Sequence, residues 1–292
     1  MHVENVVLNC VINYLFNCID LNDAKIMELY SEYYLSKKAE RFVNKIWVLD
    51  NTLNEQAVKN KMVLPNGCFN IALVSGNGWE VIIKNRCYKM VTGTYINAQI
   101  TQKAIINIKP KTKIILIQLH AWSISIFPEY DLTKFRDRII QIGYENLPFL
   151  HNIEPAFYHD VDKVIELTNK NFEELSDNNP ERTLTELMCH NTELGNEKIL
   201  KTINGHDYSN RALQIAFKKS TGLTRKQYSK LINLRKTVDY ISHPNNETSN
   251  LTSIAFKSGY FDQTHFIKIF KEIVKITPKK FESQSFFLSN KR

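Results

Sequence analysis

The sequence predicts an α+β fold, with a β-rich N-terminal part and an all-helical C-terminal part. Three observations support this prediction. Short β-branched and aromatic runs fill residues 42–127, apolar residues recur at helical spacing from about residue 130, and the last hundred residues contain an internal repeat. With 292 residues, of which 43% are hydrophobic, the chain is long enough for two packed domains.

The N-terminal part, residues 1–127, contains several short runs that are typical of strands. Turn residues separate them, as at Pro65-Asn66-Gly67, Gly76-Asn77-Gly78, Gly93 and Pro110. Closely spaced short strands favour a sandwich or a small barrel. The expected strands cover residues 46–49, 71–74, 80–83, 88–91, 104–108 and 113–119.

Residues 128–193 are expected to form a helical connector. An apolar stripe at helical spacing predicts one helix over residues 161–175. Residues 176–180, with the sequence SDNNP, break that helix, and Leu184, Leu187 and Met188 begin the apolar face of the next one.

The C-terminal part, residues 194–292, contains two copies of one pattern that are offset by 53 positions. Each copy has an N-cap residue, an apolar residue, a Phe-Lys pair and a threonine that opens the next helix. Two copies with the same spacing are far less expected by chance than one amphipathic helix. The matched pairs are Ser209 and Asp262, Leu213 and Phe266, Phe217 and Phe270, Lys218 and Lys271, Thr224 and Thr277, and Tyr228 and Phe281.

The second copy, residues 251–281, reads as a helix-turn-helix. A first helix begins near Leu251, Gly259 supplies a sharp turn, and Asp262 caps a second helix that runs to about Lys271. The polar residues left for the outer face of that helix are Gln263, Thr264, His265, Lys268 and Lys271. Side chains of these types contact base edges or phosphates in the major groove, and a recognition helix presents mainly its first turn to the bases.

The first copy is less regular. Its recognition helix is expected over residues 209–220, but Lys201 and Thr202 stand where the second copy has apolar residues, and Gly205-His206 replaces a clean turn. The helix that follows, residues 228–241, would hold the two recognition helices at a fixed separation, so that they enter successive major grooves about 34 Å apart. The outward residues of the first recognition helix are Asn210, Arg211, Gln214 and Lys218.

The C-terminal third is strongly basic. Residues 195–292 hold 18 Lys and Arg against 7 Asp and Glu, a formal net charge of +11, whereas the whole chain is +8 and residues 1–194 are therefore −3. This asymmetry favours a polyanionic partner for the C-terminal part, and a solvated basic surface is the alternative that charge alone leaves open.

These motifs resemble those of AraC/XylS-type transcription regulators. The segment Gly259-Tyr260-Phe261-Asp262-Gln263-Thr264-His265-Phe266-Ile267-Lys268-Ile269-Phe270-Lys271, followed by Thr277-Pro278, is similar to the second helix-turn-helix signature of that family. Ser209-Asn210-Arg211-Ala212-Leu213, with Phe217-Lys218 and Gly222-Leu223-Thr224, is similar to the first. The resemblance covers about residues 195–283 and implies a sequence-specific DNA-binding transcription regulator with a double helix-turn-helix domain.

The N-terminal part resembles the β domain of a subgroup of this family. Residues 42–49 and 64–71 carry this resemblance, and Asp262-Gln263-x-His265 is typical of the same subgroup. Such N-terminal domains are often cupin-like barrels that sense a small molecule or mediate dimerisation, so the resemblance implies one of these roles here. The chain departs from the family at Ile215, at Ile267 and at Thr224-Arg225, which weakens the base-contact list, particularly in the first unit.

The alternative function is a small-molecule-binding or catalytic barrel with an accessory helical domain. A metal-binding barrel needs several His residues and a carboxylate that converge, but the strand region offers only His120. Gly76-Asn77-Gly78 reads as a hairpin turn and not as a phosphate loop. Cys68 follows a turn and would be either a reactive thiol or, more often, a small buried residue. We therefore predict a protein that is not an enzyme, with no catalytic residue, metal site or cofactor.

The aromatic residues of the N-terminal part are candidates for an effector pocket, with core packing as the alternative. A dimerisation module without a ligand is a third hypothesis for this part of the chain. The partners that we expect are double-stranded promoter or operator DNA, a small-molecule effector, a second copy of the chain in a homodimer, and RNA polymerase. The pocket candidates are Trp47, Trp79, Tyr88, Tyr95 and Trp122.

Cysteine usage and hydropathy predict a cytoplasmic protein without membrane contact. Residues 6–19 are apolar but too short to span a bilayer, and they lack a basic flank, so we expect a buried strand or helix there. The five cysteines have no metal-ligand spacing, and their odd number suits a reducing compartment. They are Cys10, Cys18, Cys68, Cys87 and Cys189.

Overall fold

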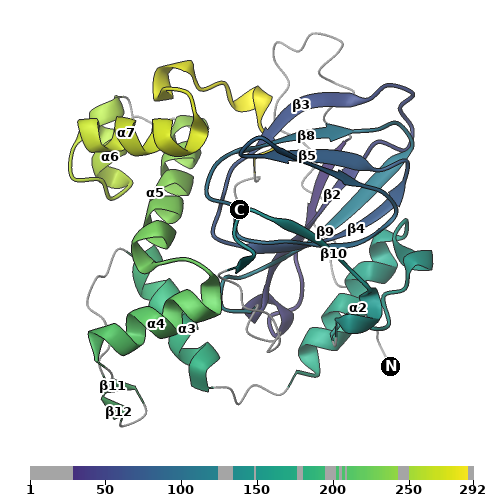
Figure 1. Ribbon diagram of the computed structural model, residues 1–292, viewed down its shortest axis with the longest axis horizontal. Helices are drawn as coiled ribbons and strands as arrows, with labels where there is room; N and C mark the ends of the chain where they lie inside the picture. The colour runs from purple at the N-terminus through teal and green to yellow at the C-terminus, as the bar shows by residue number, and fades with distance from the viewer. Residues whose placement is uncertain are drawn as a thin grey trace, which may run out of the picture.

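The computed structural model describes residues 29–123, 134–147, 149–175, 180–194, 202–203, 206–207, 209–242 and 250–288. Two antiparallel sheets form the N-terminal half and helices form the C-terminal half, so the expected α+β architecture is confirmed (Figure 1). Within these ranges, no helix has the length and apolar character needed to cross a membrane. The expectations for residues 6–19, Cys10, Cys18, residues 176–179 and Lys201 lie outside the described residues.

The two sheets pack face to face as a sandwich. Their strands are all antiparallel to their neighbours, and a layer of apolar side chains from both sheets fills the space between them. The larger sheet has the order β1 (Tyr30–Tyr33), β2 (Val43–Asp50), β9 (Thr112–Leu119), β4 (Phe69–Gly76), β7 (Gly93–Asn97) and β10 (Ile139–Ile142). The smaller sheet has the order β3 (Val58–Val63), β8 (Ala104–Ile108), β5 (Trp79–Ile83) and β6 (Arg86–Met90).

The central strands of the larger sheet are buried on both faces. In β2, Trp47 and Leu49 point between the sheets, whereas Ile46 and Val48 point to the outer face. Because successive side chains alternate, a strand covered on both sides must be apolar at nearly every position. This explains why residues 113–119 are almost continuously hydrophobic.

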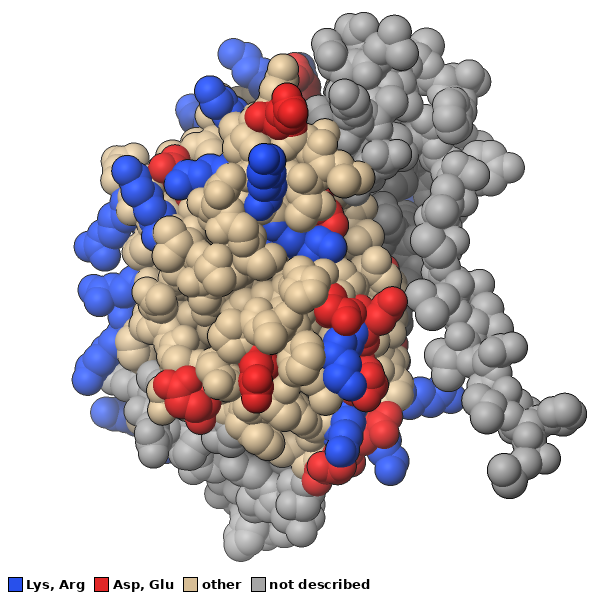
Figure 2. Space-filling model, turned by 90° about the vertical axis from the view of Figure 1, so that its right-hand side faces the viewer, with Lys and Arg blue, Asp and Glu red and all other residues tan. Residues whose placement is uncertain are grey.

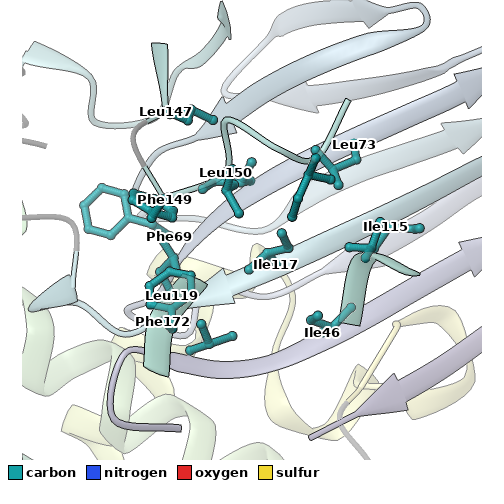
Figure 3. Packing of buried hydrophobic residues seen from close by; sticks show 14 of the residues in the cluster. Ile46, Phe69, Leu73, Ile115, Ile117, Leu119, Leu147, Phe149, Leu150 and Phe172 are labelled. Carbon is teal, nitrogen blue, oxygen red and sulfur yellow. The ribbon is translucent and has the colours of Figure 1, made fainter. Parts of the chain in front are cut away.

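A layer of short helices covers the outer face of the larger sheet. Helix α2 (Val161–Glu173) begins at Asp160, whose carboxylate accepts a hydrogen bond from the Lys163 amide at 2.9 Å, and it contributes Phe172 to the core. Figure 3 shows Phe172, Leu147, Phe149 and Leu150 meeting the strand side chains of this core. The connecting turns include η1 (Ala39–Arg41), η4 (Tyr144–Asn146) and η5 (Pro155–Phe157).

The expected helical connector, residues 128–193, contains helices α2 and α3 (Pro180–Glu193) but also one strand. Ile139–Ile142 form strand β10, which pairs with β7 at the edge of the larger sheet. Four residues are too few to show a strand periodicity, and the partner strand lies about forty residues earlier in the chain. Strands β1, β3 and β7 also went unpredicted, whereas the six expected strands are all present.

The C-terminal half contains the two expected recognition helices. Ser209 caps α4 by accepting from the Ala212 amide at 3.1 Å, and Asp262 caps α7 by accepting from the His265 amide at 2.6 Å. The repeat therefore has the structural meaning that its spacing predicted. The helices are α3 (Pro180–Glu193), α4 (Asn210–Thr221), α5 (Arg225–Ser242), α6 (Leu251–Lys257) and α7 (Gln263–Val274).

The entry into the first unit differs from that of the second. Strands β11 (Thr202–Ile203) and β12 (His206–Asp207) form a short antiparallel pair before α4, where the second unit has α6. Helices α3 and α5 both pack against α4. The described residues of this segment therefore form a strand pair before the recognition helix of the first unit.

The chain after α7 returns to the sandwich. It passes through η7 (Pro278–Lys280) and η8 (Ser283–Ser285), and the Phe287 amide then donates to the Met62 carbonyl of β3 at 2.8 Å. A bridge between Met62 and Phe286 places the tail, residues 282–288, along the edge of β3. A second link joins the Lys103 amide to the Ile273 carbonyl at 3.0 Å. The second helix-turn-helix unit is therefore held against the sandwich.

Candidate nucleic-acid interface and a cavity between the domains

Helix α7 presents its predicted polar residues away from the core. Phe266, Ile269 and Phe270 are buried in the C-terminal core, which fixes the rotation of the helix about its axis. The residues predicted to contact DNA are therefore on the opposite side. Thr264, His265, Lys268 and Lys271 are exposed, and Gln263 is half-buried.

Helix α4 has the same arrangement. Leu213 and Phe217 are fully buried, and the left-handed Gly222 (φ 75°) ends the helix. Ile215, one of the departures from the family pattern, is 58% exposed, so it does not belong to the core. The predicted residues Asn210, Arg211, Gln214 and Lys218 are all exposed.

The turn between α6 and α7 is fixed from two sides. Gly259 has φ +85°, a conformation that side chains disfavour, as the sequence predicted for this position. The Tyr260 amide donates to the Ala255 carbonyl at 3.0 Å, and the Asn233 side chain on α5 donates to the Gly259 carbonyl at 3.2 Å. The angle between α6 and α7 is therefore tied to α5.

Helix α5 contacts both helix-turn-helix units. Figure 1 shows α4 near one end of α5 and α6 and α7 near the other. The 18 residues of α5 span about 27 Å at a rise of 1.5 Å per residue. Successive major grooves on one side of a duplex are about 34 Å apart.

The charge distribution distinguishes the helical part from the sandwich. Figure 2 shows the side of the molecule opposite to the C-terminal helices. There, Asp and Glu gather with Lys and Arg along the lower part, and the middle is largely uncharged. The net charge of +11 belongs instead to residues 195–292, which include both recognition helices.

A cavity of about 120 Å³ lies inside the sandwich, at the end that faces α5. Strands of both sheets form most of its wall, α5 contributes four residues, and the tail contributes Phe287 and Leu288. The Phe287 ring stacks on Tyr30, with 5.9 Å between ring centroids. The cavity is thus bounded by the sandwich and by the helix that carries both recognition helices. The α5 residues are Leu234, Arg235, Val238 and Asp239.

The larger sheet contributes the polar residues Lys45, Asn70, Asn97 and Gln118 to the cavity wall, and the smaller sheet contributes mainly apolar ones. Lys45 forms a buried ion pair with Glu32, and the Tyr30 hydroxyl also bonds to this carboxylate. Burial lowers the pKa of Lys45, although Glu32 opposes this shift, and burial raises the pKa of Tyr30. Trp47 Nε1 donates to Asn70 Oδ1 at 3.1 Å. The apolar residues of the wall include Val81, Ile83, Ile100, Ala104, Ile106 and Ile139.

Two buried polar atoms in residues of the cavity wall have no hydrogen-bond partner among the described residues. They are the Trp79 Nε1 donor and the Asn97 Oδ1 acceptor. A buried polar group without a partner costs about 1–3 kcal/mol. A bound molecule or water that bonds to both atoms would recover that free energy.

Two of the five aromatic residues predicted to form a pocket line this cavity, namely Trp47 and Trp79. The other three are not among its lining residues. The Tyr88 hydroxyl bonds to the Asp137 carbonyl at 3.3 Å, and the Tyr95 hydroxyl donates to the Val91 carbonyl at 3.1 Å. Trp122 Nε1 donates to the Arg41 carbonyl at 2.9 Å. The side chains of these three residues instead bond to backbone carbonyls of other segments.

His120 and Cys68 were the remaining candidates for reactive chemistry. His120 stacks on Trp122 and bonds to the Glu40 carbonyl, and burial lowers its pKa to about 4. Cys68 lies in the cavity wall, where burial raises its thiol pKa to about 11, which disfavours the reactive thiolate. Among the described residues, no group of three or more His, Cys, Asp or Glu could hold a metal ion.

Sequence reasoning missed the polar residues of the cavity. Lys45, Asn70 and Gln118 occupy positions in three apolar strands that point between the sheets. A polar residue at an inward position of a buried strand is the signal that could have found them. Arg235 gave no such signal, because it lies on α5 and reaches the cavity only through the packing of the two domains.

One family model matches the helical part of the chain. The family model of the helix-turn-helix domain matches residues 206–284. No curated protein matches the sequence. Among solved structures, the chain is similar to ToxT from Vibrio cholerae in its P21 form, with 10% identity over 80% of this chain and 95% of that chain and a TM-score of 0.37.

Two further solved structures have similarly low sequence identities and TM-scores. The unsaturated fatty acid-bound wild-type ToxT from Vibrio cholerae is 12% identical over 80% of this chain and 91% of that chain, with a TM-score of 0.34. The AraC-like transcriptional activator CuxR is 8% identical over 86% of this chain and 91% of that chain, with a TM-score of 0.27. Because these TM-scores are low, the assignment of the helix-turn-helix domain rests on the match of residues 206–284 to the family model.

The exposed faces of α4 and α7 lie within the helix-turn-helix domain that the family model matches. Residues 206–284 match the model of a helix-turn-helix domain, as the resemblance seen in the sequence predicts. The β-rich part before this domain is a two-sheet sandwich with a cavity at its junction with α5.

Proposed function

We propose that this protein regulates transcription by binding a specific DNA sequence through α4 and α7, under the control of a small amphipathic molecule in the cavity. One observation carries the DNA-binding part of the proposal. The polar residues predicted from the repeat lie on the outward faces of two capped helices within the matched domain. We propose no enzymatic role for the chain.

The two helices would divide the work of recognition. In α7, Gln263, Thr264 and His265 lie in the first turn, where a recognition helix meets base edges, and Lys268 and Lys271 would meet phosphates. In α4, the cationic Arg211 and Lys218 would anchor the first unit, and Asn210 and Gln214 would lie at the bases. A domain boundary at residues 193/194 remains part of this proposal, whereas strand β10 extends the N-terminal domain beyond the expected boundary at 127/128.

The chemistry of the cavity favours an elongated molecule with a polar head. The wall includes the Arg235 guanidinium and the Lys45 ammonium, which also pairs with Glu32, together with the Asp239 carboxylate. Acceptor oxygens, above all those of a carboxylate, match such donors. The apolar residues of the cavity wall would contact the hydrocarbon part of the ligand. A cavity of this kind counts against the hypothesis that the sandwich is a filled dimerisation module without a ligand.

A ligand in this position would touch the parts that hold the recognition helices. Arg235 and Val238 lie on α5, and Phe287 lies on the tail that follows the second unit. Control requires that the ligand bind one arrangement of these elements better than another. A homodimer and a contact with RNA polymerase are further partners that we propose on the family resemblance.

Binding of the full-length protein to duplex DNA tests the first part of the proposal. A promoter fragment upstream of its own gene should bind more tightly than an unrelated duplex of equal length, and its affinity should fall steeply with salt. The measurement is fluorescence anisotropy at several salt concentrations. The proposal would be contradicted if the protein bound neither duplex, or bound both with equal affinity.

A thermal shift with oleate tests the second part. Oleate should raise the melting temperature of the protein, because ligand that binds only the folded state stabilises it. Methyl oleate, which lacks the charged head, should raise it less. Arg235→Gln should remove most of this difference between the two probes, whereas Lys89→Gln, at an exposed position on β6, should preserve it. Equal shifts with both probes would argue against a head-group site at Arg235.

A further inference from the structure

A hydrogen bond joins the two helices of the second helix-turn-helix unit at the surface. Thr252 Oγ1, in the first turn of α6, donates to Oε1 of Gln263, the first residue of α7, over 3.1 Å. The two residues are eleven positions apart, so their contact depends on how α6 and α7 are arranged. No sequence motif singled out Thr252.

The backbone on both sides holds this contact in place. Asn250 caps α6 by accepting from the Ser253 amide at 2.8 Å, and the Asp262 cap fixes the first turn of α7. The turn between the two helices is held at Gly259 by Asn233 of α5. The positions of Thr252 and Gln263 are therefore set by the fold rather than by the reach of a long side chain.

We propose that Thr252 is a positioning residue for base reading by Gln263, and that Gln263 so positioned reads an adenine. This inference rests on the proposed DNA-binding function. A free glutamine side chain samples many rotamers, and fixing it on binding opposes the association. A hydrogen bond made before DNA arrives orders the side chain in advance and removes part of that cost.

The remaining hydrogen-bonding groups of Gln263 match one base. After accepting from Thr252, Oε1 keeps a second lone pair, and Nε2 keeps two N–H donors. One acceptor beside one donor fits the N6 amino group and N7 of adenine in the major groove. Guanine presents two acceptors there, N7 and O6, and would place O6 against Oε1 of the glutamine.

The test uses the full-length protein and DNA selected from a duplex pool with a randomised central segment. Gln263→Ala identifies the base pair that Gln263 reads, as the position where the base preference disappears. Thr252→Val keeps the shape of the side chain without the hydroxyl, and Thr252→Ser keeps the hydroxyl. The measured quantity is the ratio of affinities for duplexes with adenine and with each other base at that pair.

We expect Thr252→Val to lower the preference for adenine by about three- to tenfold, the range expected for one hydrogen bond between neutral groups. Thr252→Ser should retain most of the preference. In the Gln263→Ala background, Thr252→Val should have no further effect on the preference. Affinity for duplexes that carry a different base at this pair should be unchanged by Thr252→Val.

Four results would overturn the inference. They are an unchanged preference in Thr252→Val, an equal loss of affinity for every duplex, a preference for guanine in the wild type, and an effect of Thr252→Val that persists without Gln263. An equal loss for every duplex would assign Thr252 to phosphate contact or to folding. If the wild-type protein selects no sequence from the pool, the proposed function fails as well, which distinguishes that failure from the others.

Discussion

The ring of Tyr228, on helix α5, lies directly against the backbone of Gly67 in a turn of the sandwich. A Cβ atom on Gly67 would be 2.7 Å from Tyr228 Cε2, and Gly67 has φ +77°. The Gly67 carbonyl also accepts a hydrogen bond from the Gln99 side chain at 2.6 Å. This contact brings the sandwich up to the helix that carries both recognition helices, so a single glycine is part of the domain interface.

Gly67→Ala should therefore destabilise the protein by about 1–3 kcal/mol, because the new methyl group adds a steric overlap to an unfavourable φ. Urea unfolding measures this change. Gly143→Ala is a matched control, because its Cβ would meet only the side chain of Glu145, which can rotate away. A loss of equal size in the two variants would contradict a special role for the Gly67–Tyr228 contact.

Lys268 and Gln263 should have different effects on DNA binding. Lys268→Ala should weaken binding to all duplexes by a similar factor. It should also make the slope of log affinity against log salt concentration less steep by about 1, because one fewer counterion is released on binding. Gln263→Ala should instead change the base preference at one position, by about 1–3 kcal/mol. Affinities measured at several salt concentrations on matched and mismatched duplexes separate the two effects. Lys89→Ala, at an exposed position on strand β6, is the control and should leave both quantities unchanged.

His120 should make the stability of the protein fall in mild acid. Burial lowers its pKa in the folded protein to about 4, and only part of this shift is offset by the Glu40 carbonyl. The ordinary imidazole pKa is about 6.5, so the unfolded chain takes up a proton between pH 6.5 and 4 that the folded protein does not. Stability is therefore complete above this window and decreases as the pH falls through it, by up to about 3 kcal/mol.

The comparison of wild type with His120→Gln isolates this effect, since carboxylates also titrate at low pH. The free energy of unfolding in urea should decrease less for His120→Gln than for the wild type between pH 7 and pH 4.5. Equal decreases would show that the protonation of His120 does not contribute.

The tail should stabilise the second helix-turn-helix unit. Phe286 is only 6% exposed and stacks on Phe281, with 4.8 Å between ring centroids, and Phe281 in turn packs edge-on against Phe270 of α7. Phe286→Ala should cost about 3–5 kcal/mol, as expected for loss of a buried phenylalanine. Phe261→Ala, at a side chain that is 85% exposed, should change stability by less than about 0.5 kcal/mol in the same unfolding measurement. A similar cost for both would mean that the tail is not packed as described.

The recognition helices could be predicted from the sequence because their determinants are local. The hydrogen bond from the Ala212 amide to Ser209 and that from the His265 amide to Asp262 each span three residues. The apolar stripe that buries Phe266 and Phe270 lies within one helix. The repeat then showed that the same local pattern occurs twice. Strands with long apolar runs were found for the same reason, whereas the four-residue β10 was missed because only its pairing with β7 makes it a strand.

The cavity was only half predictable. Trp47 and Trp79 stood out as aromatic residues on strands, but their neighbours in the cavity could not be derived from periodicity. Arg235 follows Trp47 by almost two hundred residues, and Phe287 comes from the far end of the chain. Their approach depends on how α5 and the tail pack on the sandwich.

The sequence by itself determined the helical DNA-binding domain, its two N-caps and the polar faces of α4 and α7. The tertiary structure alone decided that α5 and the tail close one end of the sandwich, and that Thr252 meets Gln263. The physical reason is the range of the interactions. Caps and amphipathic faces arise from residues within a few positions of one another, whereas a cavity wall and a contact between helices arise only when distant segments pack together.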